Sequence, residues 1–208
     1  GNFKEYHVAV EHEKGILKTD EGIRPNSSIE SLSTLKPVFD ENGVVTAGNA
    51  SQISDGAAAC LVMSRRKAEQ LELTPLATVT GYCATGVDSV DVMSAPIPTV
   101  QKLWKMNNRE GEKDYDLYEH NEAFASASLG VMQGLHLKHE KLNVNGGAVA
   151  MGHPLGASGC RIVLALIHAL RQSGGKRGFA TACLGGGMAT AIELETVSYT
   201  HLTLPTMS

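Results

Sequence analysis

Residues 143–159 read NVNGGAVAMGHPLGASG, a glycine-rich turn between a short extended segment and a strongly apolar helix. The helix is expected from Cys160 to Gln172, because the apolar pattern there is continuous and stops at Gly174. His153 lies inside the turn, and Pro154 fixes the backbone behind it. A surface position is the default for a loop histidine, but this rigid setting suits a general base or an oxyanion donor.

Strand and helix patterns alternate on both sides of this turn. We expect a buried strand at residues 56–63 and a helix at 64–71, followed by strands at 76–82, 116–119, 143–145, 179–184 and 188–194 and by helices at 99–106, 122–133 and 160–172. The triplet Gly185-Gly186-Gly187 joins the last two strands and is typical of a hairpin. This order predicts an α/β domain with a mixed, mainly buried sheet and helices on both faces.

Composition excludes several classes of protein. The 208 residues carry a net charge of −4, and no basic stretch is longer than three residues, so a nucleic-acid binder is not expected. No apolar run has the length of a membrane span. The four cysteines form no Cys-x-x-Cys pair, which argues against a disulfide scaffold or a zinc module and indicates a reducing compartment.

Two further segments hold a polar group among small residues. Cys183 ends an expected strand before the three glycines; a core cysteine is the simpler interpretation, but the glycines leave a thiol approachable and backbone N–H groups free, as a base or nucleophile requires. Asn121 stands at a strand-to-helix junction, where an N-cap and a catalytic role are equally compatible with the local sequence. His136 and His139 lack carboxylate neighbours and are interpreted as solvated, so no metal site is expected.

Together these motifs resemble the thiolase family. The histidine turn, the Cys-x-Gly-Gly-Gly segment at Cys183 and the Asn-Glu-Ala-Phe segment at Asn121 occur in the family's order, and upstream segments at residues 23–25, 36–39, 42–51 and 55–59 also match. The resemblance implies a thiolase fold: a mixed five-stranded βαβαβαββ half with helices on both faces, plus the end of a CoA-binding loop domain. It places that loop domain in residues 1–53, the end of the amino-terminal half in 54–76 and the carboxy-terminal half in 77–197. The tail, 198–208, falls outside the pattern, and we expect it to be disordered or non-native.

The resemblance also implies roles for individual residues. Cys183 would be the acid/base thiol that removes an α-proton, His153 would activate the nucleophilic cysteine, Asn121 would position a water in an oxyanion hole, and the N–H of Gly185 would belong to the other oxyanion hole. Substrate contacts are implied for Arg24, Ser31, Ala47 and Ser51, which would bind coenzyme A, and for Phe124, which would line the acyl pocket. Coenzyme A would be a substrate or product, with no further cofactor.

One family feature is missing from the sequence. The family's nucleophilic cysteine belongs upstream of Gly1, and the apolar settings of Cys60, Cys83 and Cys160 indicate core packing instead. We therefore expect the 208 residues to be a carboxy-terminal part of a longer chain and to have no thiolase turnover alone.

The resemblance predicts an acyl-CoA acyltransferase of fatty acid metabolism that condenses acetyl-CoA or cleaves 3-ketoacyl-CoA. Its partners would be acyl-CoA and CoA, and the full-length protein would form a homodimer or homotetramer. A cytoplasmic location is expected, or mitochondria or peroxisomes in a eukaryote. Three alternatives remain: a β-ketoacyl synthase, a non-catalytic acyl-CoA or lipid carrier, and a structural oligomer subunit.

Overall fold

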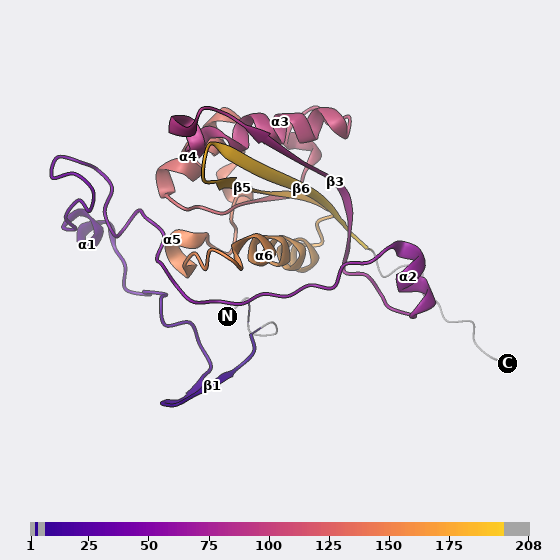
Figure 1. The fold of residues 1–208 in the computed structure, drawn as a ribbon, viewed down its shortest axis with the longest axis horizontal. Helices are drawn as coiled ribbons and strands as arrows, with labels where there is room; N and C mark the ends of the chain where they lie inside the picture. The colour runs from indigo at the N-terminus through magenta and orange to yellow at the C-terminus, as the bar shows by residue number, and fades with distance from the viewer. Residues whose placement is uncertain (1–2, 4–6, 198–208) are drawn as a thin grey trace.

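The computed structural model describes residue 3 and residues 7–197. A mixed four-stranded sheet in the order β3-β6-β5-β4 forms the centre of the molecule, as Figure 1 shows. Its strands are β3 (Ala77–Gly86), β4 (Leu117–His120), β5 (Arg177–Leu184) and β6 (Met188–Thr196). The strand β4 runs parallel to β5, and the other two pairings are antiparallel. The expected tail, 198–208, lies outside the described residues.

Helices cover both faces of this sheet, as the sequence predicts. In Figure 1, α3 (Pro96–Met106) and α4 (Ala125–Gly134) lie on one face, and the short α5 (Ala148–Met151) and the long α6 (Ser158–Ser173) lie on the other. The last helix ends where the left-handed Gly174 caps it, because only a residue without Cβ adopts that conformation at little cost.

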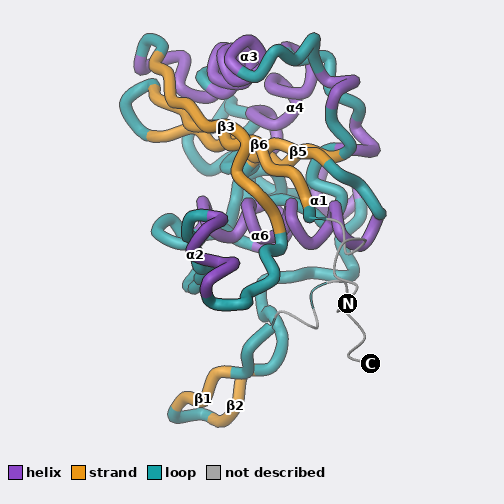
Figure 2. The backbone as a smooth tube through the Cα atoms, turned by 90° about the vertical axis from the view of Figure 1, so that its right-hand side faces the viewer, coloured by secondary structure: helices purple, strands orange, loops and turns teal. Residues whose placement is uncertain are grey.

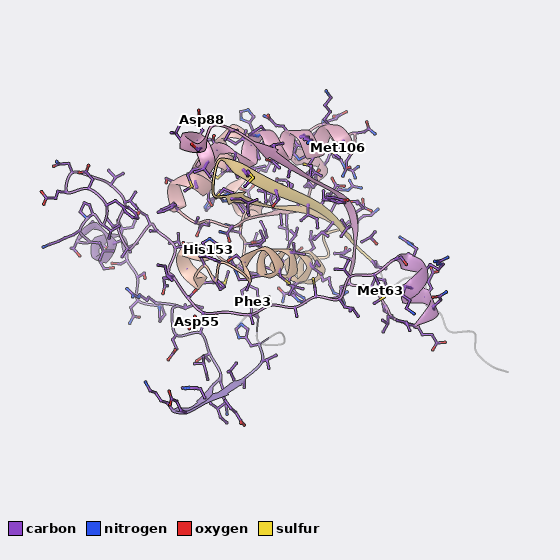
Figure 3. The ribbon with its side chains drawn as sticks, viewed as in Figure 1. Phe3, Asp55, Met63, Asp88, Met106 and His153 are labelled. Carbon is purple, nitrogen blue, oxygen red and sulfur yellow. The ribbon has the colours of Figure 1, made fainter. Side chains whose placement is uncertain are left out.

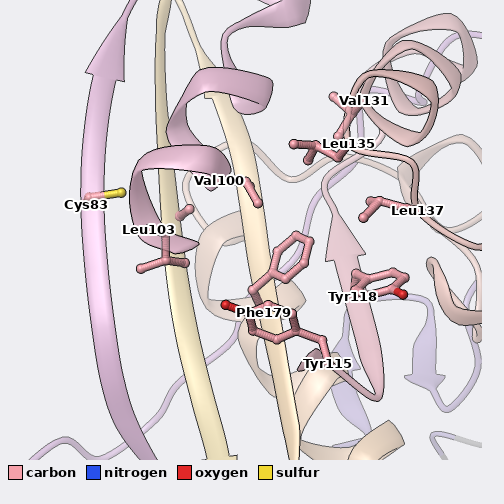
Figure 4. Packing of buried hydrophobic residues seen from close by; sticks show 10 residues of the cluster. Cys83, Val100, Leu103, Tyr115, Tyr118, Val131, Leu135, Leu137 and Phe179 are labelled. Atoms are coloured by element: carbon pink, nitrogen blue, oxygen red, sulfur yellow. The ribbon is translucent and has the colours of Figure 1, made fainter. Parts of the chain in front are cut away.

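Two apolar clusters form the core, one on each face of the sheet. Neighbouring residues of β5 point to opposite faces, so Phe179 packs with Tyr115 and Tyr118 under α3 and α4, while Ala180 packs against α6. Figure 4 shows the first cluster around the ring of Phe179, which lies 5.0 Å from that of Tyr115. Burying a side chain of this size stabilises the fold by about 1.5–3 kcal/mol.

The amino-terminal segment is less compact. It contains a small hairpin of β1 (Val10–His12) and β2 (Gly15–Leu17), which Figure 2 shows standing away from the layered part, and the short helix α1 (Ile29–Ser33). Its chain then runs past α6 to α2 (Arg65–Gln70), which is capped by Ser64 as predicted.

Two predicted strands are wrong. The expected fifth strand of the main sheet, at residues 143–145, is reduced to an isolated bridge between Leu142 and Tyr118, because the chain turns at once and Asn143 has a positive φ of 49°. The apolar run at 56–63 is unpaired and mostly exposed, since no strand among the described residues lies beside it. A strand buried on both faces needs such neighbours.

Candidate active site

Asn121 lies at the edge of the sheet where the parallel strands β4 and β5 end. It directly follows β4, and its N–H donates to the carbonyl of Thr181, 3.1 Å away and two residues before Cys183. Its side chain is buried, and the N-cap of α4 is Phe124. The N-cap interpretation of Asn121 is therefore wrong, because the helix begins three residues later than an Asn cap would require.

His153 is in contact with Asn121. The Nδ2 atom of Asn121 lies 3.2 Å from Nε2 of His153 and 3.5 Å from Nδ1. On the other side of the ring, Nδ1 lies 2.6 Å from the hydroxyl of Ser158, which donates to the carbonyl of Pro154 at 3.0 Å. Figure 3 shows His153 near the beginning of α6. Both ring nitrogens thus have polar neighbours that define the orientation of the ring.

The backbone at His153 is held by the segment that passes beneath α6. Its N–H donates to the carbonyl of Gln52 at 2.9 Å. The preceding Gly152 has φ +91°, and a Cβ there would clash with the side chain of Ser54. Glycine is therefore required at this position both by its conformation and by the close approach of the second segment.

A second brace connects the strand end to the glycine-rich turn. The carboxylate of Glu122 accepts from the N–H of Val149 at 3.2 Å and from Nδ2 of Asn143 at 3.5 Å. Glu122 itself has φ +59°, a left-handed conformation that is costly for a residue with a side chain. It is also the reason why α4 starts at Ala125 rather than at 122 as predicted.

Sequence reasoning missed the arginine that completes this arrangement. Arg161, on the first turn of α6, donates from Nη2 to Oδ1 of Asn121 at 3.4 Å. The available signal was its position, because it is the sole Asp, Glu, Lys or Arg between Ser158 and Leu170. A charge inside an otherwise apolar helix usually has a specific partner.

Burial shifts the titration of three groups around the site. The pKa of His153 is lowered by burial and by the nearby Arg161 guanidinium, which keeps the ring neutral at neutral pH. Burial also lowers the pKa of His120 to about 4 and raises that of Glu119 to about 8, although Arg161 acts against the second shift. The neutral imidazole of His153 has the protonation state that a general base needs.

The structure brings Cys183 to the same end of the sheet. It is the second-last residue of β5 and half-buried, and burial raises the pKa of its thiol. The exposed Gly185 begins the turn to β6, in which Gly186 and Gly187 have φ values of +82° and +84°. Gly186 and Gly187 therefore make the turn, and at Gly185 no atom lies within 4 Å of the position that a Cβ would occupy.

A cavity of about 1140 Å³ lies between the amino-terminal segment and the glycine-rich turn. Its lining includes four of the predicted substrate contacts: Arg24, Ser31, Ala47 and Ser51. Phe124 is not part of the lining; its ring packs edge-on against Phe39 at 6.4 Å, and its backbone bridges to Ala50. The hydroxyl of Ser31 donates to the carbonyl of Ser28, 2.9 Å away, so its proton is already used in a hydrogen bond at the beginning of α1.

The other three cysteines differ in burial. Cys83 is buried and Cys160 is half-buried, in agreement with core packing. Cys60 is exposed, so its predicted core position is wrong; it belongs to the unpaired run at 56–63, which no described strand covers. Within the described part of the chain, no group of three His, Cys, Asp or Glu side chains has the arrangement of a metal site.

The sheet, its two helix layers and the polar groups at the strand ends define an α/β protein with a candidate active site at the carboxyl edge of its parallel strands. Family models identify it further. The thiolase carboxy-terminal domain matches residues 73–196, and the thiolase amino-terminal domain matches residues 1–66. The chain belongs to the thiolase family.

Individual relatives agree with this assignment. The acetyl-CoA acetyltransferase of Cupriavidus necator is 46% identical over 192 residues, which are 90% of this chain and 48% of that protein. A probable acetyl-CoA acyltransferase of Staphylococcus aureus is also 46% identical, over 88% of this chain and 47% of its own length. The chain thus spans about half the length of the curated relatives it matches.

Solved structures show the same fold. The acetyl-CoA acetyltransferase of Bacillus anthracis superposes with a TM-score of 0.90 at 39% identity, over 95% of this chain and 51% of that one. Human mitochondrial 3-ketoacyl-CoA thiolase in complex with CoA gives a TM-score of 0.86 at 38% identity, over 95% of this chain and 50% of the human one. The predicted thiolase fold is confirmed. No helix among the described residues has the length and apolar character to cross a membrane.

Proposed function

We propose that this chain is the part of a thiolase that binds acyl-CoA and handles the α-proton during Claisen condensation or thiolysis. The observation that carries the proposal is the contact between Asn121 and the neutral His153 at the strand edge that also holds Cys183. Relatives with the names acetyl-CoA acetyltransferase and 3-ketoacyl-CoA thiolase support this reaction class.

The chemistry assigns each group one task. The thiolate of Cys183 takes a proton from the α-carbon of an acyl-CoA, and the resulting enolate oxygen is stabilised by donors at the active site. His153 keeps the nucleophilic cysteine of the complete enzyme deprotonated, while Asn121 orients a water against the thioester oxygen. The N–H of Gly185 serves the second oxyanion hole. The enolate carbon then attacks an acyl-cysteine, forming the carbon–carbon bond and releasing the cysteine thiolate.

The cavity provides the place for the coenzyme. Arg24 lies on its lining and would meet the phosphates at the nucleotide end, whereas Ala47 and Ser51 line the part nearer Asn49 and Ala123 and would contact the pantetheine. A volume of about 1140 Å³ suits a ligand of this size. In this proposal coenzyme A is substrate and product, and residues 1–53 are the end of the loop domain that holds it.

Exchange of the acetyl-CoA α-protons in D₂O, followed by proton NMR, tests this assignment on the 208-residue chain itself. Exchange needs the base and the oxyanion donors but not the nucleophilic cysteine. We expect exchange above the buffer rate, loss of it in Cys183→Ala and little change in the matched variant Cys160→Ala. Net thiolysis of acetoacetyl-CoA is not expected. Binding of acetyl-CoA without Cys183-dependent exchange would favour the non-catalytic carrier instead.

A further inference from the structure

Two cysteines far apart in the sequence lie side by side where the segment at residues 52–60 passes the beginning of α6. The thiol of Cys60 is within hydrogen-bond reach of the thiol of Cys160. Cys60 is exposed, Cys160 is half-buried, and both are free thiols in the structure. Neither has a task in the proposed reaction, so the contact between them needs another explanation.

The thiol contact continues a series of contacts between the same two segments, which Figure 1 shows running past each other. The N–H of His153 donates to the carbonyl of Gln52 at 2.9 Å. Gly56 lies so close to Pro154 that a Cβ on this glycine would be 2.8 Å from the proline ring. Both cysteines follow a few residues further along their segments. The neighbouring contacts therefore hold the two thiols together as a property of the fold.

The two sulfur atoms can approach each other without disturbing the core. Cys160 is the third residue of α6 and lies outside the row from Ile162 to Leu170 that packs this helix on the sheet. Cys60 belongs to the run at 56–63, which pairs with no strand among the described residues. A disulfide needs an S–S distance of about 2.05 Å and Cα atoms about 4.4–6.8 Å apart. Because the run is not held in a sheet, rotation of the side chains and a shift of the run can close the remaining gap.

The two thiols differ in the way that a reversible oxidation requires. Cys60 is open to solvent, so a dissolved oxidant reaches it first. Burial, and then the contact with the Cys60 thiol, raises the pKa of Cys160, which therefore reacts slowly with a free oxidant at neutral pH. An accessible thiol beside a second thiol that can displace oxygen from it is the arrangement of a redox-sensitive pair.

We propose that Cys60 and Cys160 are an oxidation-sensitive pair that hydrogen peroxide converts to a disulfide, which fastens the segment at 52–60 to the beginning of α6. The sulfur of Cys60 attacks one peroxide oxygen, the O–O bond breaks, and a sulfenic acid and one water are formed. The sulfur of Cys160 then attacks the sulfenic sulfur, the S–O bond breaks, and the hydroxide leaves with the Cys160 proton as a second water. The two thiols together lose two electrons, and the peroxide gains them. The inference does not depend on the proposed function.

Peptide mapping of the 208-residue chain tests the pairing. The reduced chain is treated with hydrogen peroxide, its free thiols are blocked with N-ethylmaleimide, and monomers from a non-reducing gel are digested with trypsin. Each cysteine falls in its own tryptic peptide: 19–65 for Cys60, 68–102 for Cys83, 142–161 for Cys160 and 178–208 for Cys183. We expect the first and third peptides to be linked as the main disulfide product and to separate after dithiothreitol.

The same treatment in urea is the control, because the unfolded chain has lost the contact and should lose the preference for this pair. Three results in the folded chain would overturn the proposal: Cys60 stays free, is oxidised without a link to Cys160, or pairs mainly with another cysteine. All of them are read from the wild-type chain, so the test does not depend on the folding of any variant.

Two variants and thermal unfolding test the order of events and the fastening. Cys160→Ser should stop at the sulfenic acid of Cys60, which dimedone traps, whereas the matched control Cys183→Ser removes the other half-buried thiol and should leave the link unchanged. The disulfide closes a loop of about 100 residues, so the oxidised chain should unfold at a higher temperature than the reduced one. Dithiothreitol should abolish this difference, and Cys160→Ser should not show it. A linked chain that unfolds no later than the reduced chain would contradict the fastening.

Discussion

The Nη2 atom of Arg109 lies 2.7 Å from Oε1 of Glu193, a carboxylate on β6 without exposed surface. The same carboxylate accepts from the hydroxyls of Tyr115 at 2.5 Å and Thr80 at 2.8 Å. Burial acts to raise the pKa of Glu193, but these donors outweigh it and lower the pKa to about 2. Glu193 is therefore an ionised group that joins β6 to β3 and to the segment between α3 and β4.

Replacing Glu193 by Gln should destabilise the domain strongly. The change leaves the Arg109 guanidinium, with a 21% exposed side chain, next to a neutral amide, and breaking such a pair costs about 3–5 kcal/mol. The free energy of unfolding from urea titrations measures the loss. Glu195→Gln is the matched control, because its pair with Arg177 is about a quarter exposed and should cost less than about 1 kcal/mol. Equal losses of stability in the two variants would contradict the expectation that the buried ion pair contributes more than the exposed one.

Alanine should have opposite effects at two glycines of the His153 region. In Gly152→Ala the new Cβ meets Ser54 at a φ of +91°, so we expect a loss of about 1–3 kcal/mol and displacement of the neighbouring imidazole. Gly159 lies inside α6 with nothing within 4 Å of a new Cβ, and alanine there should add about 0.5–1 kcal/mol. Thermal unfolding compares the two; a stable Gly152→Ala would show that Ser54 moves freely.

The thiols should differ in their rates of alkylation. Burial raises the pKa of Cys183, so iodoacetamide should modify it slowly at pH 7 and faster as the pH rises, whereas the exposed Cys60 should react first. Peptide mass spectrometry after timed quenching gives both rates in one sample. Reaction of Cys183 as fast as Cys60 at pH 7 would mean that the thiol is more accessible and more acidic than its surroundings imply.

His120 should make folding stability depend on pH. Burial lowers its pKa from 6.5 to about 4, so between these values the unfolded chain binds more protons than the folded one, and stability falls as the pH drops through this range. The full effect corresponds to about 3 kcal/mol. The raised pKa of Glu119 acts in the opposite direction above pH 4.5, so the slope must be isolated by comparison.

The comparison uses His120→Gln, which does not titrate but can still accept from Ser128, the partner 2.6 Å from the ring. The free energy of unfolding of the wild type minus that of the variant should fall between pH 7 and pH 4, by the amount assigned to His120. A difference that does not change with pH would mean that His120 has the same pKa in the folded and the unfolded chain.

Local patterns were sufficient for the elements that are stabilised by their own sequence. The capped helix α2, the hairpin of β5 and β6 and the end of α6 at Gly174 follow from caps, turns and periodicity, and all are present. The unpaired run at 56–63 was misread because an apolar run specifies burial without naming the partner that covers it. The position of a strand in the sheet is a long-range property that no local pattern contains.

The same distinction holds for the site. Motif order predicted roles for His153, Asn121 and Cys183. The contacts of Arg161 and Ser158 with this group span 40 and five positions of sequence and could not be read from it. Glu122 could not be foreseen either, since its left-handed backbone results from the brace to Val149. Side chains that orient other side chains are visible only once the fold brings them together.

The edge strand β3 has a consequence for biosynthesis. Within residues 7–197 it pairs with β6 alone, and β6 begins about a hundred residues after β3 ends. At ribosomal rates of about 5–20 residues per second, the finished β3 waits roughly 5–20 s before its partner leaves the exit tunnel. During that interval its hydrogen-bonding edge is open to other nascent chains, so the yield of native protein in the cell should depend on chaperones that shield this strand until translation is complete.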